Sequence, residues 1–341
     1  MSELRRRPPG SVDVARRAGV SQKTVSRVMN GEQYVSAEVR ERVLEAAREL
    51  GYRRNTAARA LNLGRFHRIG VASLGSSLYG PSSMLVALER HARKIGYSLS
   101  VVNTLEGEAG NVMTAVESLL DQGVDGIVLS EPIDEGRPLR IDPDVPVLSF
   151  SHIPGVSGPR VVVGGALGVD SGRLATEHLL GLGHRTVWHV AGPERWFTAG
   201  DRLRGWREAL AAAGAAEPPH LTGDWTPASG YAAGRVLAAD PEVTAVFVAN
   251  DDMAIGLLRA MAEAGRPVPD EVSVVGMDDI PSAPYLSPPL TTVRQDFEAI
   301  AAHGLTLLAG EIENGSGAVV NDDLPAELIV RHSTAPPKER T

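Results

Sequence analysis

The stretch from residue 11 to residue 30, SVDVARRAGVSQKTVSRVMN, constrains this chain more than any other. It predicts two short helices around a tight turn. Ser11 can cap the first helix, and Gly19 supplies the turn after it. Ser21 can cap the second helix, which we expect to reach about Asn30. The chain should therefore begin with a small helical domain.

The second of these helices has one apolar and one polar face. Val25, Val28 and Met29 recur at spacings of three and four residues, so they should pack on the first helix. The side chains of the opposite, solvated face are Gln22, Lys23, Ser26 and Arg27. A helix with such donors near its N-terminal end suits the DNA major groove in helix-turn-helix recognition. The plainer alternative is a helical hairpin with a solvated charged face.

A third helix should follow, capped by Ser36 and reaching about Tyr52. Its apolar face consists of Val39, Val43, Ala46, Ala47 and Leu50. Residues 53–63, RRNTAARALNL, are compatible with a helix but too few to hold one alone in water. They form either a linker or a segment that folds on DNA and inserts Leu61 into the minor groove as a wedge.

Charge is distributed unevenly along the chain. Residues 1–68 contain 15 Lys and Arg against 7 Asp and Glu, a net charge of +8. The remainder contains 19 basic and 35 acidic residues, a net charge of −16. Phosphate contacts require a local positive potential, so this asymmetry favours DNA binding confined to the first 68 residues.

The lack of cysteine and of long apolar runs excludes several classes of protein. The chain contains no cysteine, which excludes disulfides, thiolate metal sites and a cysteine nucleophile. No apolar run approaches membrane-spanning length, and no apolar segment follows the basic residues at 1–10. We therefore expect a cytoplasmic protein without a secretory signal or a membrane partner.

From residue 68 onward, expected strands alternate with expected helices. The strands are 69–73, 99–103, 126–129, 145–150, 187–191, 245–248, 272–275 and 327–330. The helices are 83–95, 110–122, 171–182, 201–213, 229–239, 253–264 and 296–309. This alternation predicts an α/β fold of parallel sheets covered by helices on both faces.

Two features mark the limits of this core. A glycine-rich stretch at 155–172 should separate two lobes, with Gly164, Gly165 and Gly168 forming a turn, since their spacing does not match a dinucleotide-binding loop. The polar tail 334–341 is expected to be disordered.

Sequence signals of catalysis are few. The sequence has no GxxxxGK[ST] loop, no HExxH and no GxSxG. The histidines lack a metal-ligand spacing, and we expect His178, His184 and His189 to be cap, surface or core groups. We therefore expect no catalytic residue, no metal and no cofactor.

Polar groups follow several expected strands, at the edge where open parallel sheets bind ligands. They are residues 78–82 (LYGPS), Asn250, Asp251, Asp252, Asp278 and Asp279, to which Arg202 and Trp225 add a guanidinium and an indole. Each could be structural, because Asn250 or Asp251 can cap a helix and Trp225 can lie in a core. Together they are the groups that a sugar site needs, since polar groups bond hydroxyls and an aromatic face covers the ring.

The motifs occur in an order that resembles the LacI/GalR (lactose repressor) family over nearly the whole chain. They are DVARRAGVSQKTVSRVMN, VSAEVRERVLEAARELGY, LYGPS, AGP at 191–193, RLRGW at 202–206, GDW at 223–225, VANDDMAIG at 248–256 and VSVVGMDDIPSAPYLSPPLTTVRQDF at 272–297. The resemblance implies a helix-turn-helix head, a hinge helix and a two-lobed core like periplasmic sugar-binding proteins. It implies a transcriptional repressor that binds a pseudo-palindromic operator in double-stranded DNA as a homodimer.

The resemblance also implies domain boundaries. These are 1–52 for the head, 53–67 for the hinge, 68–166 plus 295–324 for the first lobe, 167–294 plus 325–333 for the second lobe, and 334–341 for the tail. The chain ends without the leucine-heptad tail found in tetrameric members, which favours a dimer. Arg54 stands where the family usually has a hinge proline.

The residues that would contact DNA also follow from the resemblance. They are Ser21, Gln22, Lys23, Ser26, Arg27, Asn30, Asn55, Arg59 and Leu61. Lys23 and Arg27 suit guanine and Gln22 suits adenine, because these side chains match the groups on those base edges.

The resemblance further implies a set of effector contacts. They are Leu78, Pro81, Ser130, Ser151, Arg202, Trp225, Asn250, Asp278, Gln295 and Phe297. Arg202 and Asp278 would bond sugar hydroxyls, while Trp225 and Phe297 would pack on the ring. We expect a sugar, a galactoside in particular, that releases the repressor from its operator.

Three alternatives remain. The first is a purine-type or other sugar-responsive member of the family, whose ligand strengthens DNA binding as a corepressor. The second is a sugar-binding transport protein, which would need an export signal and no basic head. The third is a sugar-processing enzyme, which requires an acid–base pair and a nucleophile that the sequence does not provide.

Replacing Arg27 with alanine should abolish preference for the operator and leave weak, salt-sensitive binding, because base contacts specify while phosphate contacts only position. Selection from random duplexes, followed by titration of the selected and scrambled DNA, measures that preference. An unchanged preference in the variant would contradict the assignment of the recognition helix.

Overall fold

The structure of the protein is a computed structural model. It describes residues 9–29, 34–52, 64–74, 77–104, 111–130, 133–134, 136, 145–151, 153, 160–164, 168–315, 321–322 and 324–338. The chain divides into two compact units, residues 1–66 and 67–341. Asn30, Asn55, Arg59 and Leu61, like the expected hinge helix from residue 53 to residue 63, lie outside the described residues.

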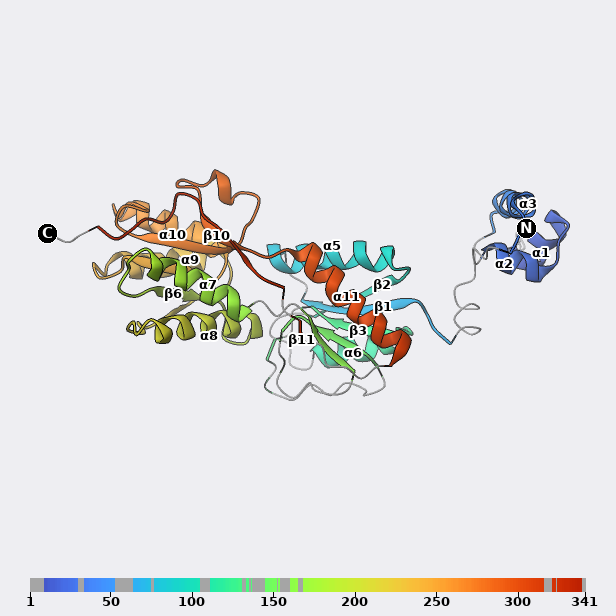
Figure 1. Ribbon diagram of the computed structural model, residues 1–341, viewed down its shortest axis with the longest axis horizontal. Coiled ribbons are helices and arrows are strands. Elements are labelled where there is room, and N and C mark those ends of the chain that lie inside the picture. Colours follow the sequence, from blue (N-terminus) through green and yellow to red (C-terminus); the bar gives the residue numbers. More distant parts are fainter. Residues whose placement is uncertain are drawn as a thin grey trace, which may run out of the picture. The chain divides into compact units, whose positions relative to one another are not determined.

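The described part of the first unit contains three short helices (Figure 1). They are α1 (Ser11–Ala18), α2 (Gln22–Met29) and α3 (Ala37–Glu49). Their apolar faces meet in one small core that includes Val14, Val25 and Val43, all fully buried. Gly19 supplies the predicted turn after α1 and has a left-handed φ of 67°. The Ser36 hydroxyl caps α3 by accepting from the Val39 N–H at 3.4 Å.

The predicted cap of α1 is wrong. Gly10, not Ser11, precedes the first helical residue, and its N–H donates to the Asp13 carboxylate at 2.9 Å. The Ser11 hydroxyl instead accepts from Gln22 Nε2 at 2.9 Å, which ties α2 to α1. The predicted cap of α2 is confirmed, because Ser21 Oγ accepts from the Thr24 N–H at 3.0 Å.

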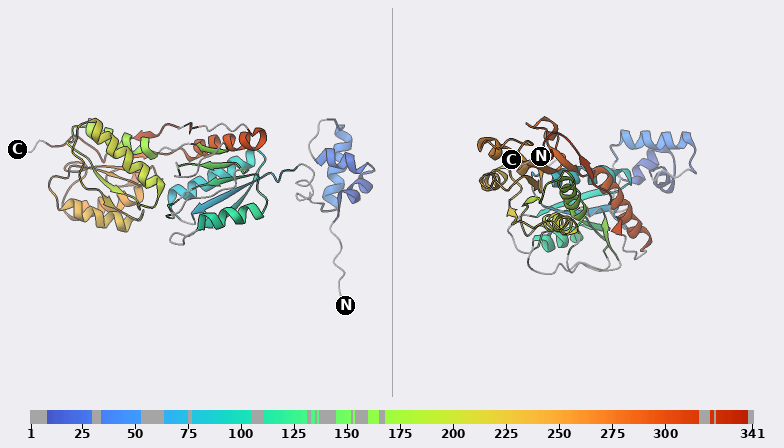
Figure 2. Two further views of the ribbon diagram at one scale, coloured as in Figure 1. Left: turned by 90° about the horizontal axis from the view of Figure 1, so that it is seen from below. Right: turned by 60° about the vertical axis from the view of Figure 1, so that its left-hand side comes forward.

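Two six-stranded sheets, each the centre of one lobe, form the described part of the second unit. The first lobe has strand order β11-β5-β4-β3-β1-β2, and all its pairs are parallel. Its strands are β1 (Arg68–Leu74), β2 (Ser98–Thr104), β3 (Gly126–Leu129), β4 (Val147–Ser149), β5 (Val161–Gly164) and β11 (Asn321–Asp322). Helices α5 (Tyr79–Lys94) and α11 (Phe297–Asn314) cover one face and α6 (Asn111–Asp121) covers the other (Figures 1 and 2).

The second lobe has strand order β12-β10-β9-β8-β6-β7. Its strands are β6 (Trp188–Ala191), β7 (Leu221–Thr222), β8 (Ala245–Val248), β9 (Ser273–Asp278), β10 (Thr291–Arg294) and β12 (Glu327–Ile329). All pairs are parallel except β10 with β12, which is antiparallel. Helices α7 (Gly168–Gly181) and α8 (Phe197–Ala212) cover one face, and α9 (Pro227–Ala238) and α10 (Asp251–Glu263) cover the other (Figure 2).

Several predicted boundaries differ from the structure. Gly164 ends strand β5 and Gly168 begins α7, so these two glycines do not form the predicted turn, and Gly165 lies outside the described residues. Strands β5, β7, β10 and β11 and the 3-10 turn η1 (Ala283–Tyr285) were not predicted. Each is only two to four residues long and is held by neighbouring strands rather than by a hydrophobic pattern of its own.

The start of the predicted disordered tail is bound to the second lobe. The Ala335 N–H donates to Ser273 Oγ at 3.0 Å, and Thr334 Oγ1 lies 3.1 Å from His178 Nε2. His184 contacts Ser273 Oγ and the Ala335 carbonyl, and His189 is fully buried with Nδ1 2.9 Å from the Phe247 carbonyl. These contacts give the three histidines structural roles.

No described helix is long and apolar enough to cross a membrane. Within the same residues, no group of three or more His, Asp or Glu side chains could hold a metal ion.

Glycines allow the helices of the second lobe to pack at backbone contact. A Cβ at Gly205 of α8 would overlap the Val169 carbonyl of α7, and one at Gly172 of α7 would overlap the Arg202 carbonyl of α8. Gly200, also in α8, is exposed and has open space around its Cα. The close crossing of α7 and α8 therefore depends on particular glycines.

Gly205→Ala should lower the free energy of unfolding by about 1–3 kcal/mol, because a methyl group there forces the two helices apart. Gly200→Ala is the matched control and should raise it by about 0.5–1 kcal/mol, because alanine is the better helix former. Urea unfolding of both variants measures the difference. Equal stability of the two variants would contradict the close-packing role of Gly205.

Candidate functional site

The exposed face of α2 carries the predicted base-reading side chains. Ser21, Gln22, Lys23, Ser26 and Arg27 are all exposed. The bond from Gln22 Nε2 to Ser11 holds the Gln22 side chain toward α1. The face is therefore solvated, basic and rich in hydrogen-bonding groups, as the sequence predicts.

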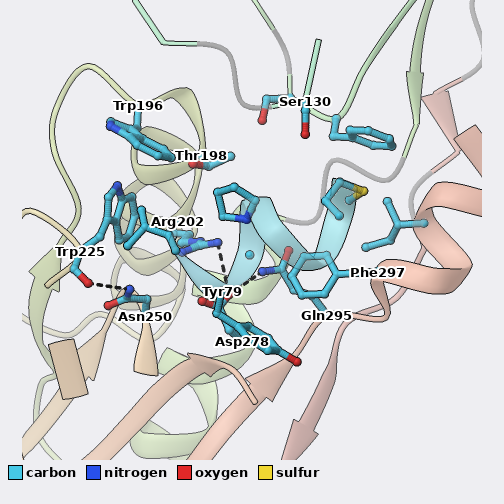
Figure 3. A pocket seen from close by; sticks show the side chains of 18 residues that line it. Tyr79, Ser130, Trp196, Thr198, Arg202, Trp225, Asn250, Asp278, Gln295 and Phe297 are labelled. Atoms are coloured by element: carbon cyan, nitrogen blue, oxygen red, sulfur yellow. Dashed lines mark hydrogen bonds and ion pairs between the residues drawn. The ribbon is translucent and has the colours of Figure 1, made fainter. Parts of the chain in front are cut away.

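The ten predicted effector residues all line one pocket in the second unit (Figure 3). The pocket lies where the carboxyl ends of both sheets meet. The first lobe contributes residues at the start of α5, after β3, after β4 and at the start of α11, and the second lobe contributes residues from α8, β9 and the loops after β7, β8 and β10. Two separate sheets thus bring together groups that are far apart in the sequence.

Asp278 is the acidic centre of the pocket. It ends β9, and its Oδ1 accepts from Gln295 Nε2 at 2.7 Å and lies 3.8 Å from Arg202 Nη2. Burial raises the pKa of Asp278 to about 6, although Arg202 and Gln295 pull the pKa the other way. Asp278 also has a φ of 111°, a strained conformation for a residue other than glycine.

Arg202 faces Asp278 from helix α8. The residue is 8% exposed, and Nη1 of its guanidinium donates to the Ala249 carbonyl at 2.5 Å. The guanidinium carbon lies 5.4 Å from the centre of the Trp225 ring, within the range of a cation–π interaction. A carbonyl, a carboxylate and an aromatic face therefore compensate the buried positive charge.

Asn250 lines the pocket and also fixes the backbone of Trp225 by a hydrogen bond. Its Oδ1 caps α10 by accepting from the Met253 N–H at 2.9 Å, and its Nδ2 donates to the Trp225 carbonyl at 3.1 Å. Trp225 has a φ of 72°, and Gly192 leaves room for its ring, because a Cβ there would overlap the indole. The cap expected as the plainer role of Asn250 is confirmed, and the same side chain positions the indole.

The neighbouring carboxylates have structural roles. Asp251 is fully buried and accepts from Thr292 Oγ1 at 2.7 Å and from the Ile280 N–H at 2.9 Å. Burial, followed by the charge of Asp278, raises the pKa of Asp251 well above its usual range. Asp279 accepts from Arg294 and Arg331. Only Asp278 of these three carboxylates lines the pocket.

Two aromatic pairs lie at the pocket. Tyr79 and Phe297 have ring centres 6.0 Å apart at 71°, and Trp196 and Trp225 have centres 5.4 Å apart at 70°. Figure 3 shows Arg202, Asp278 and Gln295 between Trp225 on one side and Phe297 on the other.

Sequence reasoning missed part of the lining. Tyr79 and Gly80 belong to the segment 78–82 that the sequence singled out, although they were not among the ten effector contacts. The lining residues that the sequence did not indicate are Met84, Phe150, Gly168, Trp196, Thr198 and Ile300. Trp196 and Thr198 were missed because α8 begins at Phe197, whereas the sequence predicts a start at residue 201. Of the ten effector contacts, Ser130, Ser151, Gln295 and Phe297 followed from the resemblance alone and not from the pattern of polar groups after strands.

Three polar atoms of the lining residues are buried without a hydrogen-bond partner among the described residues. They are Ser130 Oγ, Arg202 Nε and Trp225 Nε1. Buried polar atoms are usually satisfied, because an unmade hydrogen bond costs about 1–3 kcal/mol. A polar ligand could supply the missing partners.

The raised pKa of Asp278 gives a prediction for stability against pH. Because the folded state holds this proton more tightly than the unfolded state, stability should fall as pH rises from about 4 to about 6 and then level off. Asp278→Asn removes that titration, so its free energy of unfolding relative to the unmodified protein should rise by up to about 3 kcal/mol across this interval. Urea unfolding at pH 4, 5, 6 and 7 tests this, and parallel curves for the two proteins would contradict it.

Two regions of the chain match models of known protein families. Residues 12–55 match bacterial regulatory proteins of the lacI family. Residues 176–334 match a periplasmic binding protein-like domain. The first region covers the helices of the first unit, and the second covers most of the second lobe together with α11.

Curated relatives match over nearly the full length. The lactose operon repressor of Escherichia coli strain K12 is 34% identical over 340 residues, which cover 98% of this chain and 93% of the relative. The HTH-type transcriptional repressor PurR of Pasteurella multocida strain Pm70 is 32% identical over 327 residues, covering 94% of this chain and 97% of the relative.

Solved structures agree with these matches. A lac repressor dimer bound to operator and the anti-inducer ONPF has a TM-score of 0.83 at 34% identity, covering 96% of this chain and 100% of that chain. A complex of the transcriptional regulator CelR with cellobiose has a TM-score of 0.68 at 32% identity, covering 95% of this chain and 99% of that chain. Over nearly its whole length, the chain therefore belongs to the LacI family of ligand-responsive, DNA-binding transcription regulators.

Proposed function

We propose that this regulator is a homodimeric repressor, released from its operator when a sugar, a galactoside in particular, binds the pocket of the second unit. The observation that carries the ligand proposal is the arrangement of Arg202, Asp278 and Gln295 between Trp225 and Phe297. Carboxylate, guanidinium and amide groups bond vicinal hydroxyls, while the indole and phenyl rings cover the apolar faces of a pyranose.

The unpartnered atoms support a ligand with several hydroxyls. Trp225 Nε1 and Arg202 Nε can only donate hydrogen bonds, whereas Ser130 Oγ can both donate and accept. A hydroxyl can do both as well, so one sugar can satisfy all three atoms. The relative named lactose operon repressor and the structure of a regulator with cellobiose are consistent with a glycoside ligand.

DNA binding is assigned to the exposed face of α2. Its Gln22, Lys23 and Arg27 would read bases in the major groove, with Ser21 and Ser26 as further contacts. In a dimer, two such helices meet successive grooves of a pseudo-palindromic site. Residues 53–67 would connect the reading head to the lobes, and the protein would act on chromosomal DNA in the cytoplasm.

A thermal-shift panel of galactosides, glucosides, pentosides and purines tests the ligand class. A ligand that binds only the folded protein stabilises it by about 2.7 kcal/mol at one hundred times its dissociation constant. We expect galactosides to raise the melting temperature more than the other compounds. A shift produced by purines alone, with tighter DNA binding, would replace this proposal by a corepressor of the purine type.

Asp278→Ala should leave operator binding intact but abolish its response to the sugar, because the carboxylate is the acceptor at the centre of the pocket. Asp270→Ala is the control, since Asp270 is exposed and pairs with Lys338. Operator titration with and without the sugar measures the response. A normal response in the Asp278 variant would remove this residue from the site.

A further inference from the structure

Ile133 and Asp134, which follow β3 in the chain, contact residues of the second lobe beside the pocket. Ile133 forms an antiparallel bridge with Trp196, the residue just before α8. The Asp134 N–H donates to the Arg195 carbonyl at 2.7 Å, and Arg195 Nε donates to the Asp134 carbonyl at 2.8 Å. We call this set of contacts, made by residues 133–134 and 195–196, the interlobe clasp.

An apolar anchor accompanies these hydrogen bonds. Ile133 is only 6% exposed and belongs to the apolar cluster of the second lobe, together with Trp196, Trp225 and Val248. The strand that precedes it, β3, belongs to the sheet of the first lobe. Moving the second lobe away from this segment would expose Ile133 to water and break both hydrogen bonds of the clasp.

Trp196 joins the clasp to the pocket. It is 4% exposed, lines the pocket and packs edge to face on Trp225. In Figure 3, Trp196 lies with Thr198 and Ser130 on the side of the pocket opposite Asp278. A sugar whose hydroxyls are held at Asp278 would therefore direct its remote end toward Trp196.

We propose that Trp196 is a specificity-determining residue that selects glycosides with a ring in the aglycone, and that Ile133 and Arg195 are positioning residues that hold it in place across the lobes. This inference rests on the proposed function, because it assumes that a sugar occupies the pocket. An indole provides a flat apolar surface for a second ring, whereas a methyl aglycone is too small to cover it. The aglycone ring, Trp196 and the clasp thus form one continuous contact between ligand and both lobes.

Calorimetric titration of the full-length protein with methyl β-galactoside, phenyl β-galactoside and lactose tests the proposal. Trp196→Ala should weaken binding of the phenyl compound and of lactose by about tenfold and that of the methyl compound by less than about threefold. Trp196→Phe should restore most of the phenyl affinity, because it retains an aromatic face. An equal loss for all three compounds in Trp196→Ala would overturn the proposal.

The positioning residues are tested by the ratio of the affinities for the phenyl and the methyl galactoside. Ile133→Ala and Arg195→Ala should each reduce the preference for the phenyl over the methyl compound, while leaving Asp278 and Arg202 in place. Arg207→Ala is the matched control, because Arg207 lies in α8 and pairs with Glu217 outside the pocket. A preference unchanged in both positioning variants would show that the clasp does not position Trp196.

The outcomes separate this inference from the proposed function. If no galactoside binds the unmodified protein, the proposed ligand class fails, and the selectivity assigned to Trp196 fails with it. If galactosides bind the unmodified protein and Trp196→Ala with the same order of affinities, only the role of Trp196 fails. Far-ultraviolet circular dichroism confirms that each variant is folded before titration.

Discussion

The buried guanidinium of Arg202 is the constraint around which the ligand pocket is arranged. A charge removed from water is costly unless it is paired and hydrogen-bonded, and here the Ala249 carbonyl, the Trp225 ring and the Asp278 carboxylate surround it. Gly172 lets α7 approach the backbone of α8 at Arg202 itself, which fixes the helix that carries the charge. The same burial raises the pKa of Asp278, because it opposes ionisation of this carboxyl more than the nearby Arg202 favours it.

The two lobes contribute unequally to recognition. The second lobe supplies the charged pair and the indoles, whereas the first supplies Tyr79, Phe297 and small hydroxyl side chains. A ligand that touches both sets stabilises one arrangement of the lobes, and a ligand shifts an equilibrium only through such differential contacts. The clasp at Ile133 and Trp196 lies beside these contacts, so lobe position and pocket shape depend on the same residues.

Much of the fold and of the pocket could be predicted from the sequence, because apolar strands and helices alternate and polar groups follow the strand ends. Short strands such as β10 could not, since TTVR has little hydrophobic pattern and is ordered by its neighbours in the sheet. The cap at Gly10 depends on Asp13 reaching back along the chain. Trp196 was missed because α8 begins at Phe197, four residues before the predicted start, and Trp196 pairs with Ile133, 63 residues earlier. Local patterns carry no information about such contacts.

In the proposed function, ligand binding in the pocket is coupled to DNA binding by the first unit. The direct test titrates operator with protein at zero and saturating concentrations of the sugar that stabilises it, and titrates the same sugar into free and operator-bound protein. We expect sugar to weaken operator binding by at least about tenfold and operator to weaken sugar binding by the same factor, because linkage is reciprocal. Operator affinity that does not change at saturating sugar would contradict it.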